Sequence, residues 1–344
     1  MEATFVFPNQ LFLPSPALSR NRKVYIIRDP LFFKDRIHSV DFHKNKLLLH
    51  ILSTNEYKEE LIKTGYEVKL VESEELSGDK YLEKLIIKYS LTGIHYCDPV
   101  DFIISKRLDN AIKNTGAFSN KYDSMSFMLS SSEVEEEFFN KKSHFMAPFY
   151  KKQRVRFGIL MNDDGSPLGG KWSFDKENRK KLPKAVHVPE LLKIKYDDER
   201  MVIAKHYIEK NYKNNPGHLD FFNYPINRQN ARDALHYFLK TRFENFGTYE
   251  DAIAKDETFL FHSIITPYLN IGLITPGQVI SEALNYAKEN STPLNSVEGF
   301  VRQIIGWREF MRGVYIADGV KQRNSNFWNY TNDIPDSFYN ATTG

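Results

Sequence analysis

The sequence predicts an α/β domain built on a parallel sheet, followed by a second domain that is entirely helical. A chain of 344 residues is longer than one core usually supports, so two domains are expected. Short β-rich runs alternate with helical segments up to about residue 113, a rhythm typical of a parallel sheet with helices on both faces. From residue 194 onward the periodicity is helical, with no convincing strand.

The first domain is expected to contain four strands and three helices. β-rich runs predict strands at residues 4–7, 23–27, 67–71 and 94–97. Apolar spacing predicts helices at residues 42–63, 80–89 and 99–113. The longest of these helices ends near Gly65, a residue that commonly terminates helices.

The pattern changes between residues 130 and 184. An acidic run and then a basic run are followed by the turn-rich segment 161–172, which indicates an interdomain crossing with one helix at residues 145–160. Later helices are predicted at residues 199–212, 228–246, 267–271, 276–289 and 297–315. We therefore place the domains at residues 1–129 and 191–344, joined by residues 130–190.

Composition excludes several classes of protein. The net charge of +3 is too small to indicate a nucleic-acid-binding protein by itself, so any such surface must be a local patch. Cys97 is the single cysteine, which excludes an internal disulfide and a cysteine-held iron–sulfur cluster within this chain, and we predict no metal site. The sequence has neither a secretory leader nor a long apolar run, so we expect a cytoplasmic protein without a membrane span.

The segment 261–276, FHSIITPYLNIGLITP, contains two signals for the start of a helix. Thr266 and Thr275 each precede a proline, which predicts threonine at the N-cap and proline at the first helical position. Free N–H groups at helix starts suit the phosphates of a dinucleotide, and His262 and Ser263 lie just before the first start. Two capped helices that bind no ligand would give the same pattern.

The segment 298–310, EGFVRQIIGWREF, places Gln303, Trp307 and Phe310 at steps of four and three residues. That spacing predicts one helical face. Trp307 offers a stacking plane, and Gln303 offers donor and acceptor groups for the edge of a base. We predict that this helix and the segment 261–276 line a common hollow. An ordinary packed amphipathic helix is the alternative.

Together these motifs resemble the photolyase and cryptochrome family, and most closely its iron–sulfur bacterial branch, the deoxyribodipyrimidine photolyase-related proteins. The strongest match is QIIGWREFMRGVY at residues 303–315. Further matches extend over essentially the whole chain: FGTYEDA at 246–252, LFHS at 260–263, LNIGL at 269–273, PLNSVEGF at 293–300, GILMNDDG at 158–165, KWSFDKENRKKLP at 171–183 and FHKNKL at 42–47. The resemblance implies a Rossmann or flavodoxin-like first domain and an all-α FAD-binding domain.

The resemblance also implies a cofactor, a lesion pocket and a reaction. In the family, photoexcited reduced flavin passes an electron to a flipped pyrimidine dimer or (6-4) product in damaged DNA. FAD contacts are expected from Tyr249, His262, Ser263, Thr266, Asn270 and Arg308. DNA or lesion contacts are expected from Gln303, Trp307, Phe310, Lys151 and Arg154. For the basic residues the alternative is a solvated helix face.

Relatives in this branch hold a ribityl-lumazine antenna in the first domain. The positions here that match the antenna region are Asn9, Gln10, Asp29, His43 and Lys46. This chain departs from the family by having Pro8-Asn9-Gln10-Leu11 where relatives often carry Gly-Asp-Gln-Leu. For His43 and Lys46 the alternative is the solvated first turn of a helix.

Family members continue for many residues beyond the segment 338–344. That region carries the cluster cysteines, the motifs that embrace the flavin ring and most of the electron-relay aromatics. We therefore expect an incomplete helical domain, an exposed apolar surface on its last helices, and a possible second chain that supplies the remainder. Three functions stay open: light-driven DNA repair of (6-4) type, a cryptochrome-type light sensor, and a truncated non-catalytic fragment.

Overall fold

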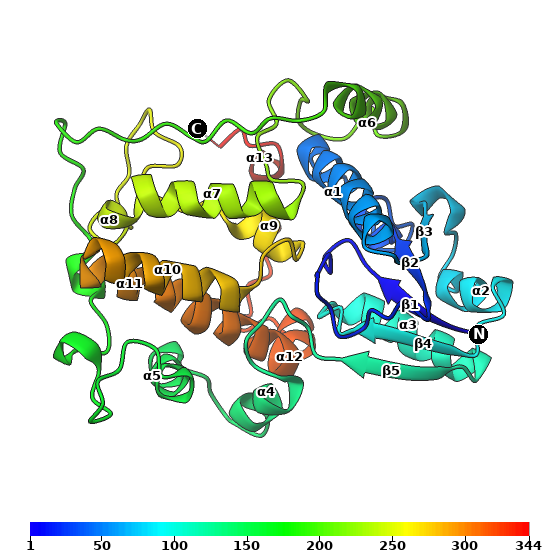
Figure 1. Ribbon diagram of the computed structural model, residues 1–344, viewed down its shortest axis with the longest axis horizontal. Helices are drawn as coiled ribbons and strands as arrows, with labels where there is room; N and C mark the ends of the chain where they lie inside the picture. The colour runs from blue at the N-terminus through cyan, green and yellow to red at the C-terminus, as the bar shows by residue number, and fades with distance from the viewer. Residues whose placement is uncertain (344) are drawn as a thin grey trace.

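The computed structural model describes residues 1–343. Its first domain is built on a sheet of five parallel strands in the order β3-β2-β1-β4-β5 (Figure 1). The strands are β1 Glu2–Val6, β2 Lys23–Ile27, β3 Val68–Val71, β4 Gly93–Cys97 and β5 Phe118–Tyr122. The predicted α/β class with a parallel sheet is confirmed.

Helices cover both faces of the sheet, as predicted. Alternate side chains of a strand point to opposite faces: Phe5 and Tyr25 pack in one core with α2 (Tyr81–Lys88) and α3 (Phe102–Thr115), and Val24 and Ile26 pack in another with α1 (Lys44–Lys63). The core beneath α1 continues into the helical domain through Leu235, Phe238 and Val301. The two domains therefore share an apolar interface.

Three elements were absent from the sequence prediction. Strand β5 has the polar sequence FSNKY and lies at the sheet edge, so its hydrophobic pattern is weak. Helix α4 (Ser131–Phe138) begins with a capping box between Ser130 and Glu133, a signal hidden within the acidic run. The short helix α13 (Asp336–Tyr339) contains no buried residue.

The region between the domains is more helical than predicted. It contains α4, α5 (Met146–Phe157) and two 3-10 turns, η3 (Leu168–Gly170) and η4 (Asp175–Glu177). Two further 3-10 turns, η1 (Pro30–Phe32) and η2 (Ser73–Glu75), follow β2 and β3. Helices α4 and α5 lie beside the helical domain in Figure 1, and Tyr150 of α5 joins its core.

The second domain is helical, as predicted, and no strand follows residue 194 in the described part of the chain. Its helices are α6 Asp198–Asn211, α7 Arg228–Thr241, α8 Phe243–Phe246, α9 Thr266–Asn270, α10 Pro276–Asn290, α11 Leu294–Val301, the π-helix η5 Arg302–Arg308, α12 Glu309–Arg323 and α13. The predicted helix at 228–246 is interrupted at Arg242. The buried guanidinium of Arg242 donates to the carbonyl oxygens of Pro189, Glu190 and Leu260.

The end of the chain carries an exposed apolar surface, as predicted. Met311 and Val320 of α12 are 57% and 55% exposed, and Phe327 and Trp328 are 83% and 70% exposed. No helix among residues 1–343 is long and apolar enough to cross a membrane.

Close packing between α12 and α4 generates a stability prediction. A Cβ atom at Gly313 would overlap the ring of buried Phe138, so Gly313→Ala should lower the free energy of unfolding by about 1–3 kcal/mol. Gly319→Ala on the same helix is the matched control, because its Cβ would meet the nearest atom, on Tyr315, at 3.5 Å. Alanine is the better helix former, so this variant should gain about 0.5–1 kcal/mol. Urea denaturation measures both changes, and equal effects would contradict the packing.

Candidate functional site

The first wall of the site lies where the strand order reverses, between β1 and β4. Loops at the carboxyl ends of strands diverge at such a point and leave a crevice that commonly binds ligands. Asn9, after β1, donates from Nδ2 to the carbonyl oxygen of Pro99, after β4, at 2.9 Å. The neighbouring Val100 has a φ of +57°, which is strained for a β-branched residue and is typical of functional sites.

The second wall is the π-helix η5, a rare element that often occurs at functional sites. Its wider turn changes which side chains share a face. Gln303 and Trp307 face the site, and the Trp307 side chain is 42% exposed. Phe310 turns away and packs at 9% exposure with Phe138 and Phe149. The single face predicted for residues 303, 307 and 310 is therefore wrong at Phe310.

A strap after β5, defined here as residues 124–129, joins the two walls. The buried carboxylate of Glu309 accepts backbone N–H bonds from Met128 at 2.7 Å and Leu129 at 3.3 Å. Arg308 Nε donates to the carbonyl oxygen of Ser126, and Arg312 Nη1 donates to that of Leu129. Both guanidinium groups also lie over the ring of Phe127, at 4.9 and 4.7 Å.

Between these walls lies a cavity of about 1240 Å³. The α/β domain contributes residues from the segments after β1, β2 and β4, from the start of α1 and from the strap: Asn9, Phe32, His43, Asn45, Lys46, Leu49, His50, Pro99, Val100, Asp101, Ser126 and Phe127. The helical domain contributes Tyr224, Thr266, Pro267, Asn270, Ile271, Gln303, Trp307, Arg308, Met311, Arg312 and Tyr315. The predicted common hollow is therefore confirmed, since Thr266 and Trp307 line the same cavity.

The cavity wall is cationic. Lys46, Arg308 and Arg312 line it, against the single carboxylate of Asp101. Burial lowers the pKa of both arginines, which nevertheless stay protonated because guanidinium is so strong a base. Burial, with smaller contributions from Lys46 and Arg28, lowers the pKa of His50 to about 3, so this imidazole is neutral. The site is suited to an anionic ligand with a polar heterocycle.

Several buried polar atoms of the wall have no partner within the described residues. They are Asn9 Oδ1, Asn45 Oδ1, His50 Nδ1, and Nε and Nη2 of Arg312. A buried polar group without a hydrogen bond costs about 1–3 kcal/mol, so such groups are rare unless a ligand or water satisfies them. Other unpaired buried polar atoms lie away from the cavity, for example on Gln153 and Arg302, so these atoms support a binding site only together with the cavity and its cationic wall.

Half of the predicted site residues meet in this cavity. Of the predicted FAD contacts, Thr266, Asn270 and Arg308 line the cavity. Arg308 Nη1 donates to Asn270 Oδ1 at 2.7 Å. Gln303 and Trp307 represent the lesion set. Asn9, His43 and Lys46 represent the antenna set. Thr266 is not the N-cap that the sequence predicted: Ile265 holds that position without a side-chain hydrogen bond, whereas Thr275 caps α10 as expected.

Five other predicted ligand contacts lie elsewhere. Gln10 is buried and donates from Nε2 to the carbonyl oxygens of Cys97 and Asp98, so it joins β1 to β4. Asp29 is fully buried and bonds to the Tyr81 hydroxyl, and burial raises its pKa to about 6. Tyr249, His262 and Ser263 are absent from the cavity wall; the Tyr249 ring packs on Phe261 at 5.5 Å.

The basic run of α5 is largely neutralised. Arg154 is fully buried and donates to the carbonyl oxygens of Ile159, Leu160 and Trp172, so the predicted DNA contact is wrong in this conformation. Lys152 and Arg156 pair with Glu137 at 2.5 and 3.0 Å. Lys151 is exposed, with its Nζ 5.7 Å from the Trp172 ring.

Sequence reasoning missed the strap and much of the sheet-side wall. His50 and Phe127 carry no motif of their own, and topology alone brings them to the cavity. Asn45 lies within FHKNKL and Arg312 within QIIGWREFMRGVY, so these two motifs were the available signals.

Comparison with known proteins gives a consistent result. Residues 4–224 match the family described as deoxyribodipyrimidine photo-lyase-related protein. The (6-4) photolyase of Agrobacterium fabrum is 31% identical over 315 residues, which cover 88% of this chain and 60% of that protein. The chain thus spans 60% of the length of this relative.

Two solved structures share the fold. A cryptochrome from Synechocystis has a TM-score of 0.62 at 14% identity, covering 98% of this chain and 67% of that one. A bacterial class III photolyase from Agrobacterium tumefaciens has a TM-score of 0.54 at 15% identity, covering 99% of this chain and 65% of that one. At these identities the likeness concerns the fold alone.

The buried carboxylate that holds the strap should make stability depend on pH. Burial raises the pKa of Glu309 from 4.5 to about 7, although the Met128 and Leu129 N–H groups and both arginines oppose this shift. Between these values the folded chain holds a proton that the unfolded chain releases, so rising pH lowers the free energy of unfolding. The slope from this group is at most about 1.4 kcal/mol per pH unit.

Glu309→Gln should remove this component of the slope. Chemical denaturation at several pH values between 4.5 and 7 measures it. Glu289→Gln, on an exposed residue of α10, is the control and should keep the wild-type profile. Parallel profiles for wild type and Glu309→Gln would contradict the assignment.

Proposed function

The chain belongs to the deoxyribodipyrimidine photo-lyase-related protein family, within the photolyase and cryptochrome group, and we propose that it is an FAD-binding protein for light-driven repair of damaged DNA. The Agrobacterium fabrum relative is a (6-4) photolyase, which favours that lesion for this chain. The interdomain cavity is the observation that carries this proposal.

The size of the cavity supports a dinucleotide. Pockets for drug-sized ligands have volumes of about 300–1,000 Å³, and this cavity, at about 1240 Å³, is larger. Its wall combines aromatic surfaces from Trp307, Phe127 and Tyr224 with the cationic groups of Arg308 and Arg312. A flavin ring can stack on the aromatic surfaces, and a pyrophosphate can pair with the cationic groups.

The polar side chains of the wall suit two ligands. Arg312 lines the cavity, and a guanidinium group can bind the phosphate oxygens of a dinucleotide in pairs. Asn9, Asn45 and neutral His50 offer donors and acceptors to a heterocycle on the sheet side. With Lys46 and His43 beside them, this side is where we place the ribityl-lumazine antenna.

A bound reduced flavin would supply the light-driven electron that splits a pyrimidine dimer. The residues of this chain bind the flavin and orient the damaged base. Trp307, half open to solvent, provides a plane for a flipped base, and Gln303 provides a polar edge beside it. Phe127 of the strap adds an apolar surface to the wall of the cavity.

A light sensor of the cryptochrome type is the second candidate, and one observation favours it. The basic run on α5 is internally paired or buried, so it offers few cations to DNA phosphates. A sensor needs the flavin but no DNA-binding face.

The proposal is tested by irradiating the FAD-loaded chain with blue light in the presence of an oligonucleotide that contains one (6-4) product. We expect restored pyrimidines, measured by chromatography, with a dark sample as the control. Retained FAD without repair of (6-4) or cyclobutane dimers would favour the sensor. Failure to bind FAD at all would overturn both candidates.

Loss of the Trp307 ring should weaken recognition of the lesion. Stacking contributes about 1–3 kcal/mol per base, so Trp307→Ala should weaken lesion binding by roughly 5- to 150-fold. Trp328→Ala is the matched control, because Trp328 is 70% exposed and lies outside the cavity. Fluorescence anisotropy with labelled damaged DNA measures both affinities. Equal losses in the two variants would argue against Trp307 as the stacking residue.

A further inference from the structure

We propose that Glu250 is a positioning residue that fixes the side-chain amide of Gln303 with its oxygen toward the cavity. The site would therefore select a ligand group that donates a hydrogen bond, such as the ring N–H of a pyrimidine. This inference rests on the function proposed above and concerns the specificity of the same site.

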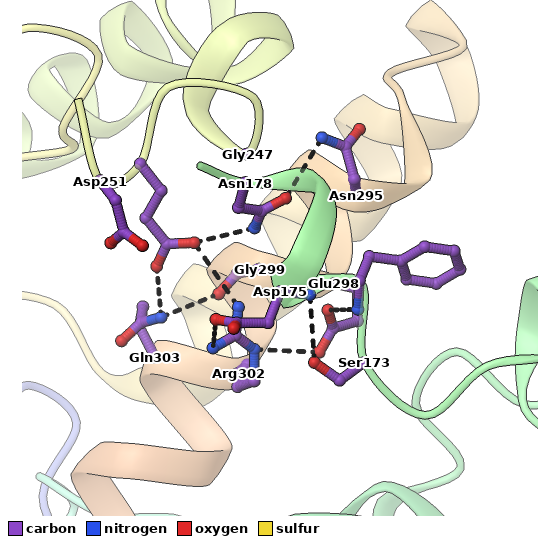
Figure 2. A network of polar contacts seen from close by, with 12 residues as sticks. Ser173, Asp175, Asn178, Gly247, Asp251, Asn295, Glu298, Gly299, Arg302 and Gln303 are labelled. Atoms are coloured by element: carbon purple, nitrogen blue, oxygen red, sulfur yellow. Dashed lines mark hydrogen bonds and ion pairs between the residues drawn. The ribbon is translucent and has the colours of Figure 1, made fainter. Parts of the chain in front are cut away.

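A network of polar side chains lies behind η5 and includes Arg302 and Gln303 (Figure 2). Its other members include Asp175, Asn178 and Glu298. Arg302 contacts Asp175 Oδ1 and Glu298 Oε1, both at 3.2 Å. Glu250 Oε2 lies 3.5 Å from Arg302 Nη2 and accepts from Asn178 Nδ2 at 2.9 Å. The Glu250 carboxylate is thus held in place by a hydrogen bond from Asn178 and by an ion pair with Arg302, besides its bond with Gln303.

Hydrogen-bond chemistry determines how the Gln303 amide is oriented. Its Nε2 donates to Glu250 Oε1 at 2.6 Å and to the Gly299 carbonyl oxygen at 3.4 Å. Carboxylate and carbonyl oxygens only accept, so the opposite orientation would place three oxygens together. Within the described residues Gln303 Oε1 has no hydrogen-bond partner, and Gln303 lines the cavity. Gln303 Oε1 is therefore available to accept a hydrogen bond from a ligand in the cavity.

Glycine at position 299 allows this arrangement. A Cβ atom there would lie 2.8 Å from Asn178 Nδ2 and 3.2 Å from Glu250 Oε2, so a side chain would displace the carboxylate. Gly299 is buried within α11, where glycine is otherwise unfavourable. Packing of Glu250 against the helix backbone gives a physical reason for it.

The charges around Glu250 act in both directions. Burial raises its pKa, Asn178 and Arg302 lower it, and the carboxylates of Asp251 and Asp175 raise it further. Glu298 and Arg179 complete the charged groups of the network. An ionised Glu250 can only accept hydrogen bonds, so it requires the NH₂ group of Gln303. A protonated Glu250 could also donate, and the Gln303 amide would then be free to turn.

A charge-conserving exchange tests the proposal. In Gln303→Glu, two carboxylates would face each other, and we expect the preference for an oligonucleotide with a (6-4) product over undamaged DNA to fall by about tenfold or more. In the double variant Glu250→Gln and Gln303→Glu, the new amide donates to the new carboxylate, whose other oxygen faces the cavity. The preference should return to within about threefold of wild type.

A double variant as weak as Gln303→Glu would overturn the proposal, because it would show that the ligand needs the amide N–H of Gln303. Glu289→Gln is the control: it removes a carboxylate at an exposed position of α10 outside this network, and it should keep the wild-type preference. Thermal melting of every variant separates loss of fold from loss of recognition.

A second measurement is independent of DNA. Selective ¹⁵N labelling of glutamine shows the side-chain NH₂ groups by NMR, and Gln303→Glu identifies the signal by its loss. We expect the Gln303 NH₂ protons to exchange with water about tenfold or more slowly than those of exposed Gln322, and faster in Glu250→Ala. Equal exchange for Gln303 and Gln322 would overturn the proposal. If wild type shows no preference for damaged DNA, the proposed function fails while this exchange still decides the role of Glu250.

Discussion

The buried carboxylate of Glu309 is the contact on which the geometry of the site depends. It accepts two backbone N–H bonds from the strap after β5, although it lies at the first turn of α12 in the other domain. Arg308 and Arg312, on either side of it, bind the strap carbonyls and enclose the Phe127 ring. One short helical segment therefore supplies both a wall of the cavity and the clamp that holds the opposite wall.

Other contacts between the domains reinforce this clamp from the sheet side. Leu11, in the long connection after β1, donates its N–H to the carbonyl oxygen of Ile271 at 2.9 Å. Arg228 Nη2 donates to the carbonyl oxygen of Leu11, and Tyr315 accepts from the N–H of Phe102 at the start of α3. The polar network around Arg302 fixes η5 from behind. The cavity is thus bounded by groups that are already ordered without a ligand, which reduces the entropic cost of binding.

The sequence could predict the parts of this structure that rest on local patterns. Short β-rich runs and helical spacing predicted four of the strands and most of the helices, and the motif around Trp307 located one wall of the site. The rest depends on contacts distant in sequence. Strand β5 lies at an edge and lacks apolar alternation, and a π-helix cannot be distinguished from an α-helix by spacing, which misplaced Phe310. Arg154 looked like a surface cation, but carbonyl groups of a later turn enclose it.

The two domains form one body around a preformed cavity, and the distance between them tests this directly. Cys97 is the single cysteine and is buried, so spin labels can be placed selectively at Lys113→Cys on α3 and Lys288→Cys on α10, both exposed positions. Pulsed electron paramagnetic resonance then measures the distance between the domains. We expect one narrow distribution of distances, unchanged by FAD and broadened by Glu309→Ala. A broad or two-peaked distribution in the otherwise unaltered chain would contradict it.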